Sequence, residues 1–153
     1  MTKQVLRIYV DTSVFGGVFD KEFAEPTKIF LHQASLGFFQ LVTSVAVRNE
    51  IRQALEQVQS VFARFSQLLE TVRVNEDALR LRTAYIQSGI LTEKNATDAL
   101  HVAMATVAQC AAIVSWNFKH IVQRRRIHGF EAVNTLMDYR PPEIFSPREI
   151  IEA

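Results

Sequence analysis

The stretch VLRIYVDTSVFGG, residues 5–17, joins an apolar run to an acid and a set of small residues. The run from Val5 to Val10 predicts a strand buried on both faces of a parallel sheet. Asp11 follows directly, so its carboxylate would project from the carboxyl end of that strand, the edge at which open α/β sheets build their sites. Aspartate before Thr-Ser and two glycines is also a good turn former, which gives Asp11 a purely structural alternative.

Two more acids occupy comparable positions. Glu50 comes after the apolar run LVTS (residues 41–44), and Asp98 begins the helix-like stretch DALHVAMA (98–105). Each has an ordinary interpretation, because a glutamate within a helix is commonly solvated and the helix dipole favours an acid in the first turn. Their coincidence with Asp11 at the ends of elements that meet at one sheet edge favours a site. Carboxylates gathered from several elements predict a hard divalent cation, Mg²⁺ or Mn²⁺, held by Asp11, Glu50 and Asp98.

The composition is that of one globular domain spanning residues 1–153, with 48% hydrophobic and 22% charged residues. A formal net charge of +1 means that affinity for nucleic acid requires a local basic patch. The single cysteine, Cys110, has apolar neighbours and predicts a small buried side chain in a reducing, cytoplasmic protein. The sequence shows no signal-peptide pattern and no run near the roughly 18 apolar residues that span a bilayer, so no membrane partner is expected.

Short apolar runs alternate with helical patterns along the chain. The expected strands are Val5–Val10, Phe39–Thr43, Val72–Val74, Ala112–Ser115 and Ala132–Asn134. The expected helices are Pro26–Leu36, Val45–Leu55 after the cap Ser44, Val61–Leu69, a segment from the cap Asn75 to Ser88, Asp98–Gln109 after Asn95 or Thr97, and the capping-box segment SPREI at 146–150. This alternation predicts right-handed βαβ units and a three-layer α/β/α sandwich with a parallel sheet.

Three segments resemble the PIN-domain family of metal-dependent nucleases. They are VDTSVFGG (10–17), TSVAVRNEI (43–51) and TDALHVAMATVAQCAAIVSWNFKHI (97–121), and the trailing HGFEAVN and SPREI extend the similarity over almost the whole chain. The resemblance implies four or five parallel strands flanked by helices, with acids gathered at one edge. It also implies an endoribonuclease, often the toxin half of a type II toxin–antitoxin pair held in check by a small antitoxin, and a homodimer.

The same resemblance assigns roles to individual residues. Asp11, Glu50 and Asp98 match the three family acids, and Ser13 and Ser115 match small hydroxyl positions near the metal. Where the family often has a fourth aspartate, this chain has Asn117, whose amide binds ligands without supplying charge. One tightly held cation is therefore expected, with a two-metal mechanism left open.

A basic cluster follows the third segment and could contact RNA phosphates. Its members are Lys119, His120, Arg124, Arg125, Arg126 and His128, with Lys119 and the three arginines as the RNA-binding candidates; its alternative is a solvated charged turn. His101, three residues after Asp98, has a structural interpretation on an apolar helix, and the four histidines and one cysteine lack zinc spacing.

Two other functions remain open from the sequence. One is a PIN-like module that has lost catalysis and binds RNA or protein, an interpretation that Asn117 encourages. The other is a different metal-dependent phosphohydrolase. The aspartyl-nucleophile type usually has a second acid two residues after the first, whereas Asp11 is followed by Thr12 and Ser13.

Overall fold

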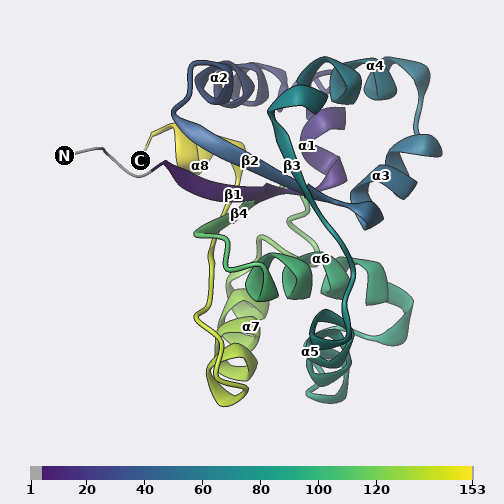
Figure 1. Cartoon of the computed structure of the whole chain (residues 1–153), viewed down its shortest axis with the longest axis vertical. Helices are drawn as coiled ribbons and strands as arrows, with labels where there is room; N and C mark the ends of the chain where they lie inside the picture. The colour runs from purple at the N-terminus through teal and green to yellow at the C-terminus, as the bar shows by residue number, and fades with distance from the viewer. Residues whose placement is uncertain (1–4, 153) are drawn as a thin grey trace.

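The computed structural model describes residues 5–152, and within them five parallel strands form one sheet in the order β3-β2-β1-β4-β5 (Figure 1). The strands are β1 (Leu6–Val10), β2 (Phe39–Ser44), β3 (Leu69–Val72), β4 (Ala112–Val114) and β5 (Glu143–Phe145). β1 lies at the centre and pairs with β2 on one side and β4 on the other, with Val10 opposite Val114. The predicted parallel sheet is confirmed.

Helices cover both faces of the sheet. The α-helices are α1 (Thr12–Gly17), α2 (Ala24–Ser35), α3 (Val45–Arg52), α4 (Glu56–Phe65), α5 (Glu76–Gln87), α6 (Ala96–Val107), α7 (Arg124–Leu136) and α8 (Pro147–Ile151), with short 3₁₀ turns at Ser66–Leu68 and Glu93–Asn95. In Figure 1, α1, α2 and α4 lie on one side of the sheet and α5, α6 and α7 on the other. The predicted three-layer α/β/α sandwich is therefore confirmed.

The predicted helix caps form as local chemistry requires. Ser44 accepts a hydrogen bond from the Val47 backbone N–H at the start of α3, and Asn75 caps α5 in the same way. Ser146 and Glu149 complete a capping box with Pro147 in the first turn of α8. These caps fix where the chain turns from strand or loop into helix.

Several predicted boundaries are wrong. The predicted strand Ala132–Asn134 lies inside α7, where Phe130, Val133 and Asn134 are buried at the 3–4 spacing of one helical face. The fifth strand is instead Glu143–Phe145. The third strand starts earlier than predicted, because Leu69 to Val72 pairs with β2 and the expected helix Val61–Leu69 ends as α4 at Phe65.

Other differences concern the helices. The expected helix Val45–Leu55 ends at Arg52, and α2 begins at Ala24, two residues before the predicted start. The residues after Asp11 form the helix α1 and not a simple turn. Arg124 to Arg126 form the first turn of α7, whereas Lys119 and His120 lie in the turn before it.

The core fills both helical layers, and a few apolar side chains stay outside it. Cys110 is buried as predicted, and burial raises the pKa of its thiol to about 11. Three of the eleven phenylalanines, Phe19, Phe38 and Phe118, are 45%, 58% and 44% exposed. In residues 5–152 no helix is long and apolar enough to cross a membrane.

Gly17 is required because α1 packs closely against the loop that follows β4. A Cβ atom at this position would lie 2.7 Å from Trp116 Nε1 and 2.8 Å from Thr27 Oγ1, two atoms that are hydrogen-bonded to each other. At Gly16 a Cβ atom would meet no heavy atom within 4 Å. The second glycine of the VDTSVFGG stretch therefore has a packing role that the first lacks.

We expect Gly17→Ala to lower the free energy of unfolding by about 1–3 kcal/mol, the usual cost of overpacking a core. Gly16→Ala should leave it unchanged or raise it by up to about 1 kcal/mol, because alanine is the better helix former. Urea denaturation of both variants measures the difference. Equal effects of the two substitutions would contradict the packing role of Gly17.

Candidate active site

The candidate site lies at the point where the order in which strands are added to the sheet reverses. After β1 the chain adds β2 and β3 on one side, and it then returns to the other side of β1 to form β4 and β5. Asp11 and Ser115 are the first residues after β1 and β4, at the carboxyl ends of neighbouring strands. Open α/β sheets bind ligands at such a reversal point.

The buried carboxylate of Asp11 accepts two serine hydroxyls. It is 4% exposed, and Ser13 Oγ and Ser115 Oγ lie 2.6 and 2.8 Å from its two oxygens. The backbone N–H of Trp116 donates to Ser13 Oγ at 2.9 Å and so ties the β4 loop to α1. The structure thus brings together Asp11, Ser13 and Ser115, three of the predicted site residues.

The charge of Asp11 is only partly compensated. Burial raises the pKa of its carboxyl group, the positive charge of His101 and the two serine hydroxyls lower it, and the charge of Glu50 raises it. The net effect is a raised pKa, because removal from water outweighs the hydrogen bonds. A nearby cation would favour the ionised form.

Glu50 reaches the same edge from α3. Its Oε1 accepts hydrogen bonds from Thr12 Oγ1 at 2.9 Å and from His101 Nε2 at 2.5 Å. Burial raises the pKa of Glu50, but the hydrogen bond and charge of His101, with Thr12, lower it further, so the net pKa lies below its ordinary value. Glu50 is therefore an ionised partner of the imidazole.

His101 lies at the centre of a buried hydrogen-bonded chain that sequence analysis did not predict. Its ring is 1% exposed, and its Nδ1 lies 2.7 Å from the hydroxyl of Tyr9, which lies 2.7 Å from Ser44 Oγ. The chain links β1, the start of α3 and α6 to the Glu50 carboxylate. The three-residue spacing from Asp98 was the one signal for His101, and nothing local distinguished Tyr9 from a core residue.

Asp98 is placed by the first turn of α6 and held by a second histidine. Its Oδ2 accepts His120 Nδ1 at 2.9 Å, a contact that sequence analysis missed. Asn117 Oδ1 accepts the His120 backbone N–H at 2.9 Å, and the Asn117 N–H donates to Ser115 Oγ at 2.9 Å. Asn117 therefore shapes the loop that carries His120 to Asp98.

The acids act together on the charge of His101. Burial lowers the pKa of this imidazole, but the Glu50 hydrogen bond and the charges of Asp11, Glu50 and Asp98 outweigh burial and raise it. Their oxygen donors suit Mg²⁺ or Mn²⁺ chemically, and the raised pKa of Asp11 leaves charge for a cation to balance. However, in the described part of the chain no three His, Cys, Asp or Glu side chains are arranged to hold a metal ion. Sharing one ion would require the carboxylates to turn from their present protein partners.

The basic cluster is divided between two hollows. Consecutive helical residues point about 100° apart, so the three arginines of α7 leave the helix in different directions. Arg124 lines a hollow beside Phe118, whereas Arg125 and Arg126 line another beside Ile90. Arg126 also donates to the backbone carbonyls of Ile90 and Lys119.

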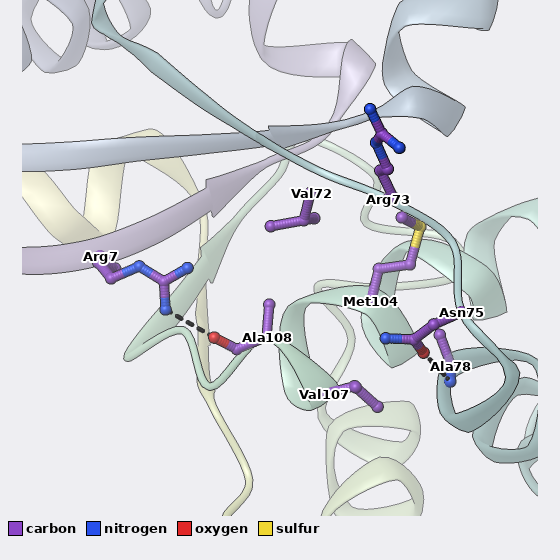
Figure 2. A pocket seen from close by; sticks show the side chains of 8 residues that line it. All are labelled: Arg7, Val72, Arg73, Asn75, Ala78, Met104, Val107 and Ala108. Carbon is purple, nitrogen blue, oxygen red and sulfur yellow. Dashed lines mark hydrogen bonds between the residues drawn. The ribbon is translucent and has the colours of Figure 1, made fainter.

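A further hollow, shown in Figure 2, lies away from the acids between the end of β3 and the last turns of α6. Its volume is about 370 Å³. Arg7 lines it, but this guanidinium pairs with Glu70 at 2.6 Å and donates to the carbonyl of Ala108. Asn75 is occupied as the cap of α5. This hollow contains none of the predicted site residues.

Comparison with known proteins gives structural matches only. No protein-family model matches the sequence, and no curated protein matches it. Among solved structures, VapBC2 from Rickettsia felis, bound to a DNA fragment from its promoter, aligns with a TM-score of 0.59 at 16% identity over 92% of this chain and 98% of that one. FitAcB from Neisseria gonorrhoeae aligns with a TM-score of 0.59 at 15% identity over 92% and 97% of the two chains. The chain has a PIN-like fold.

We expect the imidazole of His101 to titrate above 6.5, its ordinary pKa, and Glu50→Gln to lower that midpoint by removing its hydrogen-bonded carboxylate. A raised folded pKa stabilises the protein below the unfolded pKa, and this contribution is lost as the pH rises through the folded pKa. The stability that results from the lowered pKa of Glu50 is present above pH 4.5, and it is lost as the pH falls through the folded pKa.

Glu50→Gln should therefore lower the free energy of unfolding most between pH 4.5 and 6.5, the ordinary pKa values of glutamate and histidine. Imidazole ¹⁵N NMR and urea denaturation across pH measure the two effects. Asp77→Asn, on the exposed surface of α5, is the matched control and should leave the His101 midpoint in place. An unshifted midpoint in Glu50→Gln would contradict the pairing.

Proposed function

We propose that the protein is a Mg²⁺- or Mn²⁺-dependent endoribonuclease and the toxin component of a type II toxin–antitoxin pair. The observation that carries the proposal is the buried Asp11 carboxylate, held by Ser13 and Ser115 at the reversal point of a PIN-like sheet. The motif resemblance of the three acid-bearing segments supports the same reaction.

In this proposal Asp11 and Asp98, with Glu50 directly or through water, would hold the cation. When bound, a divalent cation would supply Lewis-acid chemistry, by which a phosphoryl oxygen is polarised and the pKa of a water molecule is lowered. Ser13 and Ser115 hold the Asp11 carboxylate in place by their hydrogen bonds.

Further residues orient those ligands and the substrate. Thr12 and His101 fix the Glu50 carboxylate, and Asn117 holds the loop that carries His120 to Asp98. Lys119, Arg124 and Arg125 are exposed and are proposed to contact RNA phosphates. Arg126 is proposed as a weaker phosphate contact, because its guanidinium already donates to two backbone carbonyls.

The proposed partner is a small antitoxin, and the proposed compartment is the cytoplasm. VapBC2 and FitAcB, two structures whose fold this chain shares, support the proposal of a partner. The buried Cys110 thiol is consistent with a reducing compartment. A C-terminal segment of the antitoxin inserted among the acids would block the cation.

A specific observation favours a second candidate, a PIN-like module that binds RNA or protein with weak or no catalysis. Glu50 is paired with His101 and Asp98 with His120, so two of the three acids have a compensating group within the protein. Such a module would bind RNA without cleaving it. A third candidate, another metal-dependent phosphohydrolase, would cleave small phosphate esters in place of RNA.

We expect the protein to cleave single-stranded RNA with Mg²⁺ or Mn²⁺ and to be inactive in excess chelator. Asp11→Asn and Asp98→Asn should each lower the rate by at least about 100-fold, because each removes a charged ligand. Asp77→Asn should cleave at the wild-type rate. Wild-type cleavage in chelator or in either site variant would eliminate the metal mechanism, and cleavage of a phosphomonoester alone would favour the phosphohydrolase.

We expect Asn117→Asp to tighten Mn²⁺ binding, because an added carboxylate favours a hard cation. The aspartate can keep the hydrogen bond from the His120 backbone N–H, so the loop should retain its shape. Isothermal titration calorimetry measures the affinity, and Asn49→Asp on the outer side of α3 is a control for added charge. An unchanged affinity would place residue 117 outside the coordination sphere.

We expect the protein to form a homodimer, since several exposed phenylalanines remain outside the core of one chain. Light scattering at micromolar concentration should give twice the 17.4 kDa mass of the chain. A mass of one chain at that concentration would contradict the dimer.

A further inference from the structure

A hollow of about 370 Å³ lies beside the loop that leaves β4, between that loop, the first turns of α7 and β5. We call it the Phe118 groove. Its apolar lining comes from Phe118, Val122, Ile127 and Ile144, and its polar lining from Gln123, Arg124, His128 and Glu149. An apolar lining with cationic side chains is suited to a ligand that has a flat apolar part and a negative charge.

Phe118 forms an exposed aromatic wall on a rigid support. Its ring centroid lies 5.9 Å from that of Trp116 and 6.0 Å from that of Phe23. Trp116 and Phe23 are themselves stacked at 4.0 Å with nearly parallel planes, and the Trp116 indole N–H donates to Thr27. The Phe118 ring packs against these two rings, yet 44% of the residue stays exposed to solvent. An exposed aromatic ring is a surface on which unpaired bases stack.

Two side chains that can carry positive charge, Arg124 and His128, line the groove. Arg124 is exposed and forms no ion pair among the residues that the structure describes, whereas His128 lies 4.0 Å from Glu131. Glu149 also lines the groove, and its carboxylate accepts the backbone N–H of Ser146 at 2.9 Å. A phosphate is therefore expected on the Arg124 side, with Glu149 available to an amino or hydroxyl group.

One short loop connects the groove to the acids. Asn117 donates to Ser115 Oγ, which donates to Asp11, and His120 contacts Asp98. Phe118 lies between Asn117 and His120 in the sequence, so its Cα lies within about 8 Å of that of His120. One short loop therefore carries both Phe118, which lines the groove, and the residues that contact the acids.

We propose that the Phe118 groove binds one unpaired nucleotide of an RNA strand whose neighbouring phosphate lies at the acids. The base stacks on Phe118, and its phosphate faces Arg124. This subsite rests on the proposed function for its substrate class, but it requires only RNA binding and no cleavage. It would make the protein selective for single-stranded RNA, because a paired base cannot leave its helix to reach the groove without cost.

Binding of an eight-nucleotide single-stranded RNA tests the subsite, measured by fluorescence anisotropy in an Asp98→Asn background that prevents cleavage. Polyphosphate of similar charge is the probe without bases. Phe118→Leu should weaken RNA binding by about 5- to 100-fold, the effect of losing one stacked base, and leave polyphosphate binding unchanged. Phe118→Tyr should restore RNA binding. Phe38→Leu, at an aromatic residue 58% exposed just before β2, should change neither, and light scattering of each variant controls for self-association.

Arg124→Gln provides a second measurement that needs no change in the aromatic support. It should reduce the slope of log K against log salt by about 0.7, the value for one lost phosphate contact on a single strand. Equal RNA affinity in Phe118→Leu and the parent, or equal losses for RNA and polyphosphate, would overturn the subsite. A Phe118→Leu variant that changed only the oligomeric mass would also overturn it and assign the groove to a protein contact.

The subsite and the proposed function fail separately. Absence of RNA cleavage in the Asp98-intact protein, together with Phe118-dependent RNA binding, would reject the nuclease and keep the subsite. Metal-dependent cleavage with a KM for RNA that Phe118→Leu leaves unaltered would keep the nuclease and reject the subsite.

Discussion

The carboxylate of Asp11 is withdrawn from water at the end of the central strand, and such a group costs several kcal/mol unless hydrogen bonds or opposite charge offset its desolvation. Much of the surrounding structure supplies that compensation. Ser115 reaches the carboxylate because β4 lies beside β1, and Ser13 reaches it because a helix begins at Thr12. That helix in turn requires Gly17 to pack against Trp116. Sheet order, helix start and glycine position are all linked to one buried charge.

The parts of the structure that local chemistry determines were predictable. Asp11 directly follows an apolar run. Ser44, Asn75 and Ser146 each cap the helix that follows them in the sequence. The parts that depend on distant partners were not. β5 follows two prolines and becomes a strand by pairing with β4, while Ala132–Asn134 has a strand-like composition but lies on a helix. Likewise, His101 meets Tyr9 across 92 residues and His120 meets Asp98 across 22, and no spacing in the sequence encodes either contact.

The two histidines give the acidic cluster an unusual balance of charge. Each places a nitrogen next to a carboxylate that the fold would otherwise leave to a cation, and the buried Tyr9–Ser44 chain restricts the His101 ring to one orientation. Among residues 5–152, Asp11 has no hydrogen-bonded histidine, and its carboxylate accepts the hydroxyl groups of Ser13 and Ser115. A cation would therefore gain most at Asp11, whereas at Glu50 and Asp98 it must displace or share existing contacts. In the proposed mechanism, the energy of that exchange sets how tightly the cation is held.

The central place of β1 has a consequence for the time at which the site forms. Asp11 is synthesised before its partner Ser115, because the hydrogen bond between them spans 104 residues. At about 5–20 residues per second, the ribosome needs roughly 5–20 s to add that stretch. During this interval one edge of β1 has no strand β4 to pair with, and the carboxylate remains in water. The acidic site therefore assembles only after β4 has been synthesised, when β2 and α3 have already been made.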